Sequence, residues 1–129
     1  MKSAFRNMRN IRNHTRTSVI KVKFSKAVNG VCKLYSSLQR KLAERFEDDD
    51  NVETFETNVK VDELPIDGTF TSDFLVKFKD GSFKVYECVL RRHITKPMTM
   101  KLLSLSRGYW MKKGVGFAIA TETEENGKI

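Results

Sequence analysis

Apolar residues recur every four positions in one early segment of the chain, which is the spacing of an amphipathic helix. The apolar positions are Leu34, Leu38, Leu42 and Phe46. Ser36 or Ser37 can cap the start of this helix, because a serine hydroxyl accepts a hydrogen bond from the first turn. The run of three aspartates and an asparagine at 48–51 then ends it after about three turns.

The middle of the chain changes to the alternating pattern that is typical of strands. Residues 52–61 alternate loosely and predict one strand. Residues 69–79 and 82–90 are rich in Phe, Val, Thr and Tyr, and they flank Asp80 and Gly81. Two such runs joined by Asp-Gly predict a β-hairpin, with alternate side chains of its second strand on opposite faces.

A second helix and a last strand complete the pattern. The helix is expected to begin with Thr95 as its cap and Pro97 in its first turn, and to end at residues 112–114. Residues 115–121 predict a short apolar strand. This order predicts one α/β domain with a central mixed sheet flanked by helices. The expected parts are a basic N-terminal arm at 1–26, the domain at 27–122 and a polar tail at 123–129.

Composition restricts the class of protein. The chain has 129 residues, of which 40% are hydrophobic and 31% charged, and this is the balance of one globular domain. No apolar run approaches the roughly 20 residues of a membrane-spanning helix, so we expect a cytoplasmic protein without a membrane partner. Cys32 and Cys88 have no close spacing to each other or to His14 or His93, which favours neither a disulfide framework nor a zinc site.

The net charge of +8 is distributed unevenly. Residues 1–45 hold twelve Lys and Arg and one acid, residues 46–73 ten acids and one Lys, and residues 74–129 eleven bases and five acids. Carboxylates repel phosphate unless a cation lies between them, so this pairing indicates metal-dependent work on nucleic acid. The alternative is that the basic segment packs against an acidic face of its own domain or of a partner.

The basic arm has regularly spaced arginines. Arg6, Arg9, Arg12 and Arg16 would share one face if the segment is helical. Polar Asn and Thr fill the gaps between them, so the arm has little apolar surface to bury. We expect it to become ordered only on phosphates or on another protein.

Two acids are the candidate metal ligands. Asp73 lies in an apolar strand, where an unpaired charge is costly to bury. If strand pairing brings Asp73 beside Glu87, the acids repel unless a cation such as Mg²⁺ lies between them, with room left for phosphate and water. The alternative is that Asp73 caps a bulge or pairs with a lysine, and that Glu87 faces solvent.

Three segments carry a family resemblance. They are GTFTSDFLVKFKDG at 68–81, YEC at 86–88 and KLLSLSRGYW at 101–110. Together they resemble the N-terminal nuclease domain of TnsA, the endonuclease subunit of heteromeric cut-and-paste transposases. RNIR at 9–12, KFS at 23–25, SSLQR at 36–40 and residues 55–61 extend the resemblance over nearly the whole chain. The resemblance implies a PD-(D/E)XK, restriction-endonuclease-like fold.

The resemblance also implies an active site that this chain retains in part. The acid of the family's first helix falls at Gln39, which offers an oxygen without charge, and the central aspartate is Asp73. The next strand carries an acid or Gln, one residue and then Lys, and here these positions are Glu87, Cys88 and Val89. Mg²⁺ would then be held by Asp73, Glu87 and Cys88, with Gln39 completing the site.

The missing lysine is the main departure from the family pattern. Valine can neither orient the attacking water nor offset charge at phosphorus, and such help is typically worth ~10²–10⁴-fold in rate. A shift of two residues would place Arg91 at the lysine position if the strand continues. Arginine can clamp phosphate there but is a poor base, because it stays protonated.

The sequence therefore predicts a TnsA-like DNA-binding protein of a transposon or phage, in which metal-dependent cleavage is weak or lost. The expected DNA contacts are Arg6, Arg9, Arg12, Arg16, Lys21, Lys23, Arg91 and Arg92. Phosphate contacts do not specify sequence, so site choice needs a protein partner, either a transposase subunit or a virion protein. The bacterial host's cytoplasm is the expected location. The alternative is a non-catalytic structural protein, such as a phage head-completion or neck component within a virion, or a transposition-complex scaffold.

Overall fold

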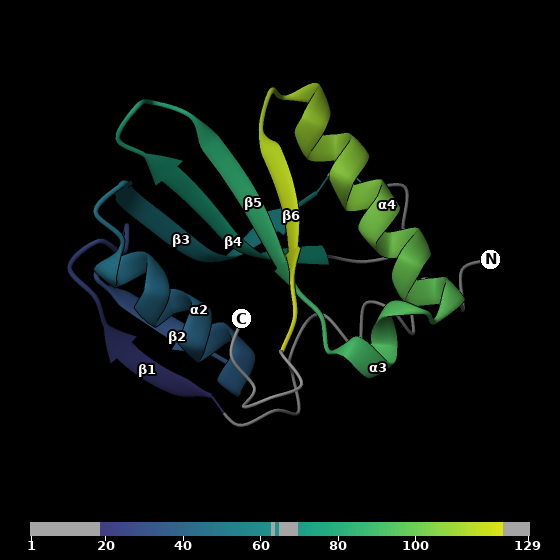
Figure 1. Cartoon of the computed structure of the whole chain (residues 1–129), viewed down its shortest axis with the longest axis horizontal. Coiled ribbons are helices and arrows are strands. Elements are labelled where there is room, and N and C mark those ends of the chain that lie inside the picture. Colours follow the sequence, from purple (N-terminus) through teal and green to yellow (C-terminus); the bar gives the residue numbers. More distant parts are fainter. Residues whose placement is uncertain (1–18, 63, 65–69, 123–129) are drawn as a thin grey trace.

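The computed structural model describes residues 19–62, 64 and 70–122 as an α/β arrangement of two sheets and three helices (Figure 1). A four-stranded mixed sheet has the order β3-β4-β5-β6, with β5 and β6 parallel and the other pairs antiparallel. A separate antiparallel hairpin is formed by β1 and β2. The strands are β1 (Ile20–Lys23), β2 (Val31–Leu34), β3 (Val52–Val61), β4 (Phe70–Phe78), β5 (Phe83–Cys88) and β6 (Gly116–Ala120), and the helices are α2 (Ser37–Asp48), α3 (Arg91–Ile94) and α4 (Pro97–Lys112).

Helices α2 and α4 cover opposite faces of the four-stranded sheet (Figure 1). Phe74 of β4 and its partner Tyr86 of β5 pack into the buried cluster that includes Leu42 and Phe46 of α2, the cluster of α2. The adjacent pair, Leu75 and Val85, packs into the buried cluster that includes Leu102 and Trp110 of α4, the cluster of α4. Because successive strand residues point to opposite faces, the two helices lie on different sides.

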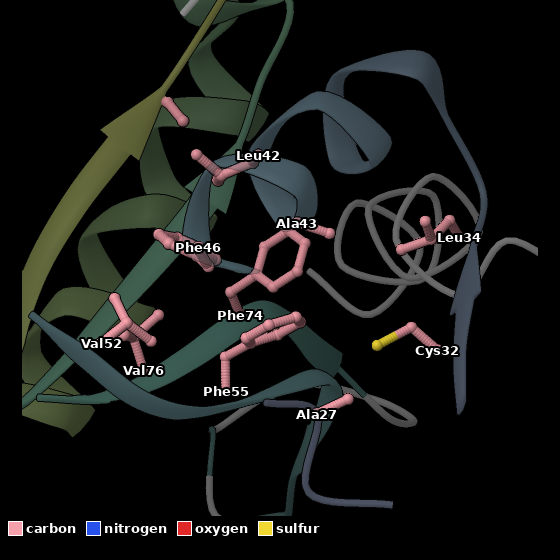
Figure 2. Packing of buried hydrophobic residues seen from close by; sticks show 11 residues of the cluster. Ala27, Cys32, Leu34, Leu42, Ala43, Phe46, Val52, Phe55, Phe74 and Val76 are labelled. Atoms are coloured by element: carbon pink, nitrogen blue, oxygen red, sulfur yellow. The ribbon is translucent and has the colours of Figure 1, made fainter. Parts of the chain in front are cut away.

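The cluster beneath α2 is an aromatic core closed by the β1–β2 hairpin. Phe46 of α2 meets Phe55 and Phe74 at ring-centroid distances of 5.7 and 5.2 Å (Figure 2). Cys32 and Leu34 of β2 are buried in the same cluster. The hairpin is therefore a third layer that covers α2's side of the sheet.

The two long helices are close to their predicted bounds. The Ser36 hydroxyl accepts a hydrogen bond from the backbone N–H of Gln39 at 3.1 Å and caps α2, as predicted. Leu34, which the spacing assigns to this helix, belongs to β2. Helix α4 begins at Pro97, but its N-cap is Lys96 and not Thr95. Thr95 is the C-cap residue that follows α3 and has helical backbone angles, whereas an N-cap is extended. No helix of the described residues is long and apolar enough to cross a bilayer.

The sequence patterns missed β1, β2 and α3. The first two are only four residues long, and residues 20–23 fall in the segment expected to be an arm. Strand β5 ends at Cys88, and Arg91 begins α3, so the idea that Arg91 continues the strand is wrong. The Arg91 backbone N–H and Nε instead donate to Glu122 at 2.9 and 2.8 Å. The expected arginine contacts at 6, 9, 12 and 16, and the tail at 123–129, lie outside the described residues.

Candidate functional site

Midway along β3 and β4, the side chains of both strands change the face of the sheet to which they point. Thr57 pairs with Phe74 and Val59 pairs with Ser72, which leaves Asn58 opposite Asp73. Asn58 has a φ of +53°, a left-handed conformation that asparagine tolerates better than most residues. The alternation of both strands is interrupted at this point.

The interruption changes which helix the residues of β4 meet. Phe70 belongs to the cluster of α4, and the Ser72 hydroxyl accepts a hydrogen bond from Trp110 of that helix at 3.0 Å. Phe74 and Val76 continue the same set of alternate positions along β4, yet they belong to the cluster of α2. Asp73 lies between the two sets and turns its carboxylate toward α2.

The Asp73 carboxylate is buried and accepts hydrogen bonds at both oxygens. Its exposed fraction is 2%. Oδ1 accepts from Nε2 of Gln39, and Oδ2 accepts from the backbone N–H of Cys88, both at 2.7 Å. Two charge-assisted hydrogen bonds of this length compensate much of the cost of burying the charge.

Gln39 is held by a fixed pattern of donors and acceptors. Its Nε2 also donates to Oδ1 of Asn58 at 3.1 Å, and its Oε1 accepts from the Tyr35 N–H at 2.9 Å. Asn58 in turn donates to the carbonyl of Lys33 at 2.7 Å. The amide nitrogen of Gln39 therefore faces Asp73, while its oxygen caps the backbone that leads into α2. The network joins the hairpin, α2 and the sheet.

Glu87 has exposed fraction 0% and is engaged on the other side of the sheet. Its Oε1 accepts from the Asp73 backbone N–H at 3.0 Å. Its Oε2 accepts from the hydroxyls of Ser72 and of Ser106, which lies on α4, at 2.7 and 2.8 Å. The alternative in which Glu87 faces solvent is wrong.

In the structure, different helices engage the two acids of the predicted metal site. Asp73 is bonded to α2 and Glu87 to α4, and every one of their four oxygens accepts a hydrogen bond from the protein. Gln39 turns a nitrogen toward Asp73, whereas Mg²⁺ requires oxygen ligands. These residues do not fit a Mg²⁺ held jointly by Asp73, Glu87 and Gln39. Within the described residues, no three acids, histidines or cysteines are grouped as a metal site.

The positions that follow Glu87 contribute packing and backbone bonds. Cys88 is half-buried and packs against the cluster of α2, and its N–H is a donor to Asp73. Val89, at the position that the resemblance gives to lysine, has an exposed fraction of 6% and donates its N–H to the Ala120 carbonyl at 2.9 Å. An aliphatic side chain is suited to this interior position.

Sequence reasoning missed four polar members of the network. They are Asn58, Ser72, Ser106 and Trp110. Trp110 lies in the core with an exposed fraction of 6%, and its indole N–H is a hydrogen-bond donor. The only available signal was a serine within each of two apolar runs, because a buried hydroxyl needs a partner.

The predicted DNA-contacting residues that are described lie at the surface. Lys21 and Lys23 are exposed on β1, and Arg91 and Arg92 are exposed on α3. The cationic surface and the buried acids are separate features of the fold.

Comparison with protein-family models and with curated proteins finds no match to this chain. The TnsA resemblance therefore depends on the sequence segments quoted above.

Proposed function

We propose that the chain is a DNA-binding protein with a TnsA-like, restriction-endonuclease-like fold whose nuclease site has become part of the interior, so that it binds DNA without cutting it. The observation that carries this proposal is the saturation of both acids: each oxygen of Asp73 and Glu87 accepts a hydrogen bond from the protein. A carboxylate used in this way supports packing rather than catalysis.

Metal-dependent phosphodiester cleavage needs a cation with open positions for phosphate and water. Gln39, Asp73 and Glu87 have exposed fractions of 2% or less, so a phosphate group cannot reach their oxygens without rearrangement of the surrounding elements. Val89 supplies none of the charge that a lysine would place near the phosphorus. The proposal is therefore that the acids have been retained because they join α2 and α4 to the sheet.

The charge of the chain supports binding to DNA. The net charge is +8, and exposed lysines and arginines occur on β1, α2, α3 and α4. Such a surface attracts a polyanion in a sequence-independent way. The choice of a DNA site is then assigned to a protein partner, a transposase subunit or a virion protein, as the resemblance implies.

Two measurements on the full chain test this proposal. Incubation of supercoiled plasmid with Mg²⁺ or Mn²⁺ should give no nicking above the background of the matched Asp73→Asn protein. Fluorescence anisotropy with labelled duplex DNA should show binding that weakens steeply with salt. Nicking that Asp73→Asn abolishes would contradict the loss of activity. Absence of DNA binding would favour the alternative, a structural protein that recognises another protein.

A further inference from the structure

One face of the β1–β2 hairpin carries three lysines. The register places Lys21 opposite Lys33 and Lys23 opposite Val31. The alternate positions, including Cys32 and Leu34, point into the core cluster, so the lysines occupy the outer face. All three are exposed, and Val31 between them is 44% exposed.

Within the part of the chain that the structure describes, no acid pairs with this face. No ion pair or hydrogen bond there engages the ammonium groups of Lys21, Lys23 or Lys33, whereas Lys60 and Lys77 each pair with a carboxylate. Like charges directly opposite each other on a β-ladder are destabilising. A chain that places Lys21 against Lys33 therefore accepts repulsion that an anionic partner would relieve.

We propose that the outer face of this hairpin binds the phosphate backbone of duplex DNA, an inference that rests on the proposed function and deepens it. Lysines two apart on one strand are about 7 Å apart, close to the axial advance of two nucleotides of one DNA strand. A two-stranded β-ribbon is also narrow enough to lie along the major groove, which is about 12 Å wide. Lysine acts as a point charge on phosphate, so this face contributes affinity and not sequence readout.

Protection of an exposed edge is the competing explanation for the lysines. Natural proteins place lysine on edge strands to prevent association with other strands. That role requires charge but no ligand, so it leaves DNA affinity independent of these three side chains. The two explanations therefore differ in a measurable quantity.

The test compares two triple variants of the full chain. The ribbon variant combines Lys21→Gln, Lys23→Gln and Lys33→Gln. The control variant makes the same charge change at exposed lysines outside the hairpin, namely Lys79→Gln, Lys96→Gln and Lys112→Gln. Circular dichroism and thermal unfolding verify that both fold, and anisotropy gives Kd for one duplex between roughly 50 and 200 mM salt.

Loss of three phosphate contacts reduces the slope of log K against log salt by about 2.7 and raises Kd at least about tenfold at low salt. We expect this change in the ribbon variant and less than about a threefold change in the control, which retains the contacts and loses only general attraction. Equal binding by wild type and the ribbon variant would overturn the hairpin assignment and leave DNA binding intact. Equal weakening in both variants would overturn it as well, since charge alone would then suffice. A wild-type chain that does not bind DNA would overturn both proposals.

Discussion

Replacement of Glu87 by alanine removes one acceptor that serves three buried donors. The donors are the backbone N–H of Asp73 and the hydroxyls of Ser72 and Ser106. An unsatisfied buried donor costs about 1–3 kcal/mol. The hydroxyls can reorient toward other acceptors, so we count the Asp73 N–H and one hydroxyl, which gives a loss of about 2–6 kcal/mol.

This loss is large against a total stability of about 5–15 kcal/mol for a domain. At about 4 °C per kcal/mol, the midpoint temperature of thermal unfolding should fall by roughly 8–24 °C. Glu87→Gln retains an acceptor at Oε1 and should lose less. Urea unfolding followed by circular dichroism, with EDTA present, measures the free energy of unfolding of each variant without a divalent cation.

The sign of the effect distinguishes a structural network from a metal site. In a site built for a cation, two neighbouring acids repel each other when the cation is removed. Removal of one acid would then raise the free energy of unfolding in EDTA. A Glu87→Ala protein that is as stable as wild type, or more stable, would refute the reasoning.

Three further predictions follow from the buried and surface acids and from the buried thiol. Gln39→Glu replaces the donor at 2.7 Å from Asp73 with a second carboxylate, so the free energy of unfolding should fall at neutral pH. Because repulsion raises the folded-state pKa of the pair, that loss should shrink as urea titrations are repeated at lower pH, and a pH-independent loss would contradict this cause. Burial raises the pKa of the Cys32 thiol above 9.0, so peptide mass spectrometry should find it alkylated by iodoacetamide in urea but protected in the native protein. The hydrogen bond from the Ser25 hydroxyl is the largest cause that lowers the pKa of the Glu47 carboxyl below 4.5, and backbone hydrogen bonds add to it. The ionised carboxylate therefore stabilises the fold above pH 4.5, and this contribution is lost as the pH falls through the lowered folded-state pKa. The stability difference between wild type and Glu47→Gln should therefore narrow on acidification, and a difference that widens would be inconsistent with the shift.

The elements that the sequence predicts well have strong local signals. Asp80 and Gly81 mark the turn between β4 and β5, and the Gly81 φ of +91° is the conformation that favours glycine. The four-residue spacing ahead of Phe46 and the capping hydroxyl of Ser36 define α2 within a few positions. The alternation of β5 also separates Tyr86 from Glu87 correctly.

The site could not be predicted in the same way, because its geometry depends on pairing between distant residues. Alternation alone cannot show that β4 changes faces at Asp73, where the left-handed Asn58 lies opposite on the neighbouring strand. The partners of the acids are also remote: Gln39 lies 34 positions before Asp73, and Ser106 lies 19 positions after Glu87. Two acids on adjacent strands are compatible both with a metal site and with a hydrogen-bonded core. Only their directions decide between the two.

Binding of Mn²⁺ to the full chain, measured by electron paramagnetic resonance of the free ion, tests the central claim most directly. We claim that the protein's own donors occupy the oxygens of Asp73 and Glu87. The signal of free Mn²⁺ should then rise with added Mn²⁺ as it does in buffer alone. It should be the same in the presence of the wild-type and the Asp73→Asn proteins. Stoichiometric binding by wild type that Asp73→Asn abolishes would contradict the account.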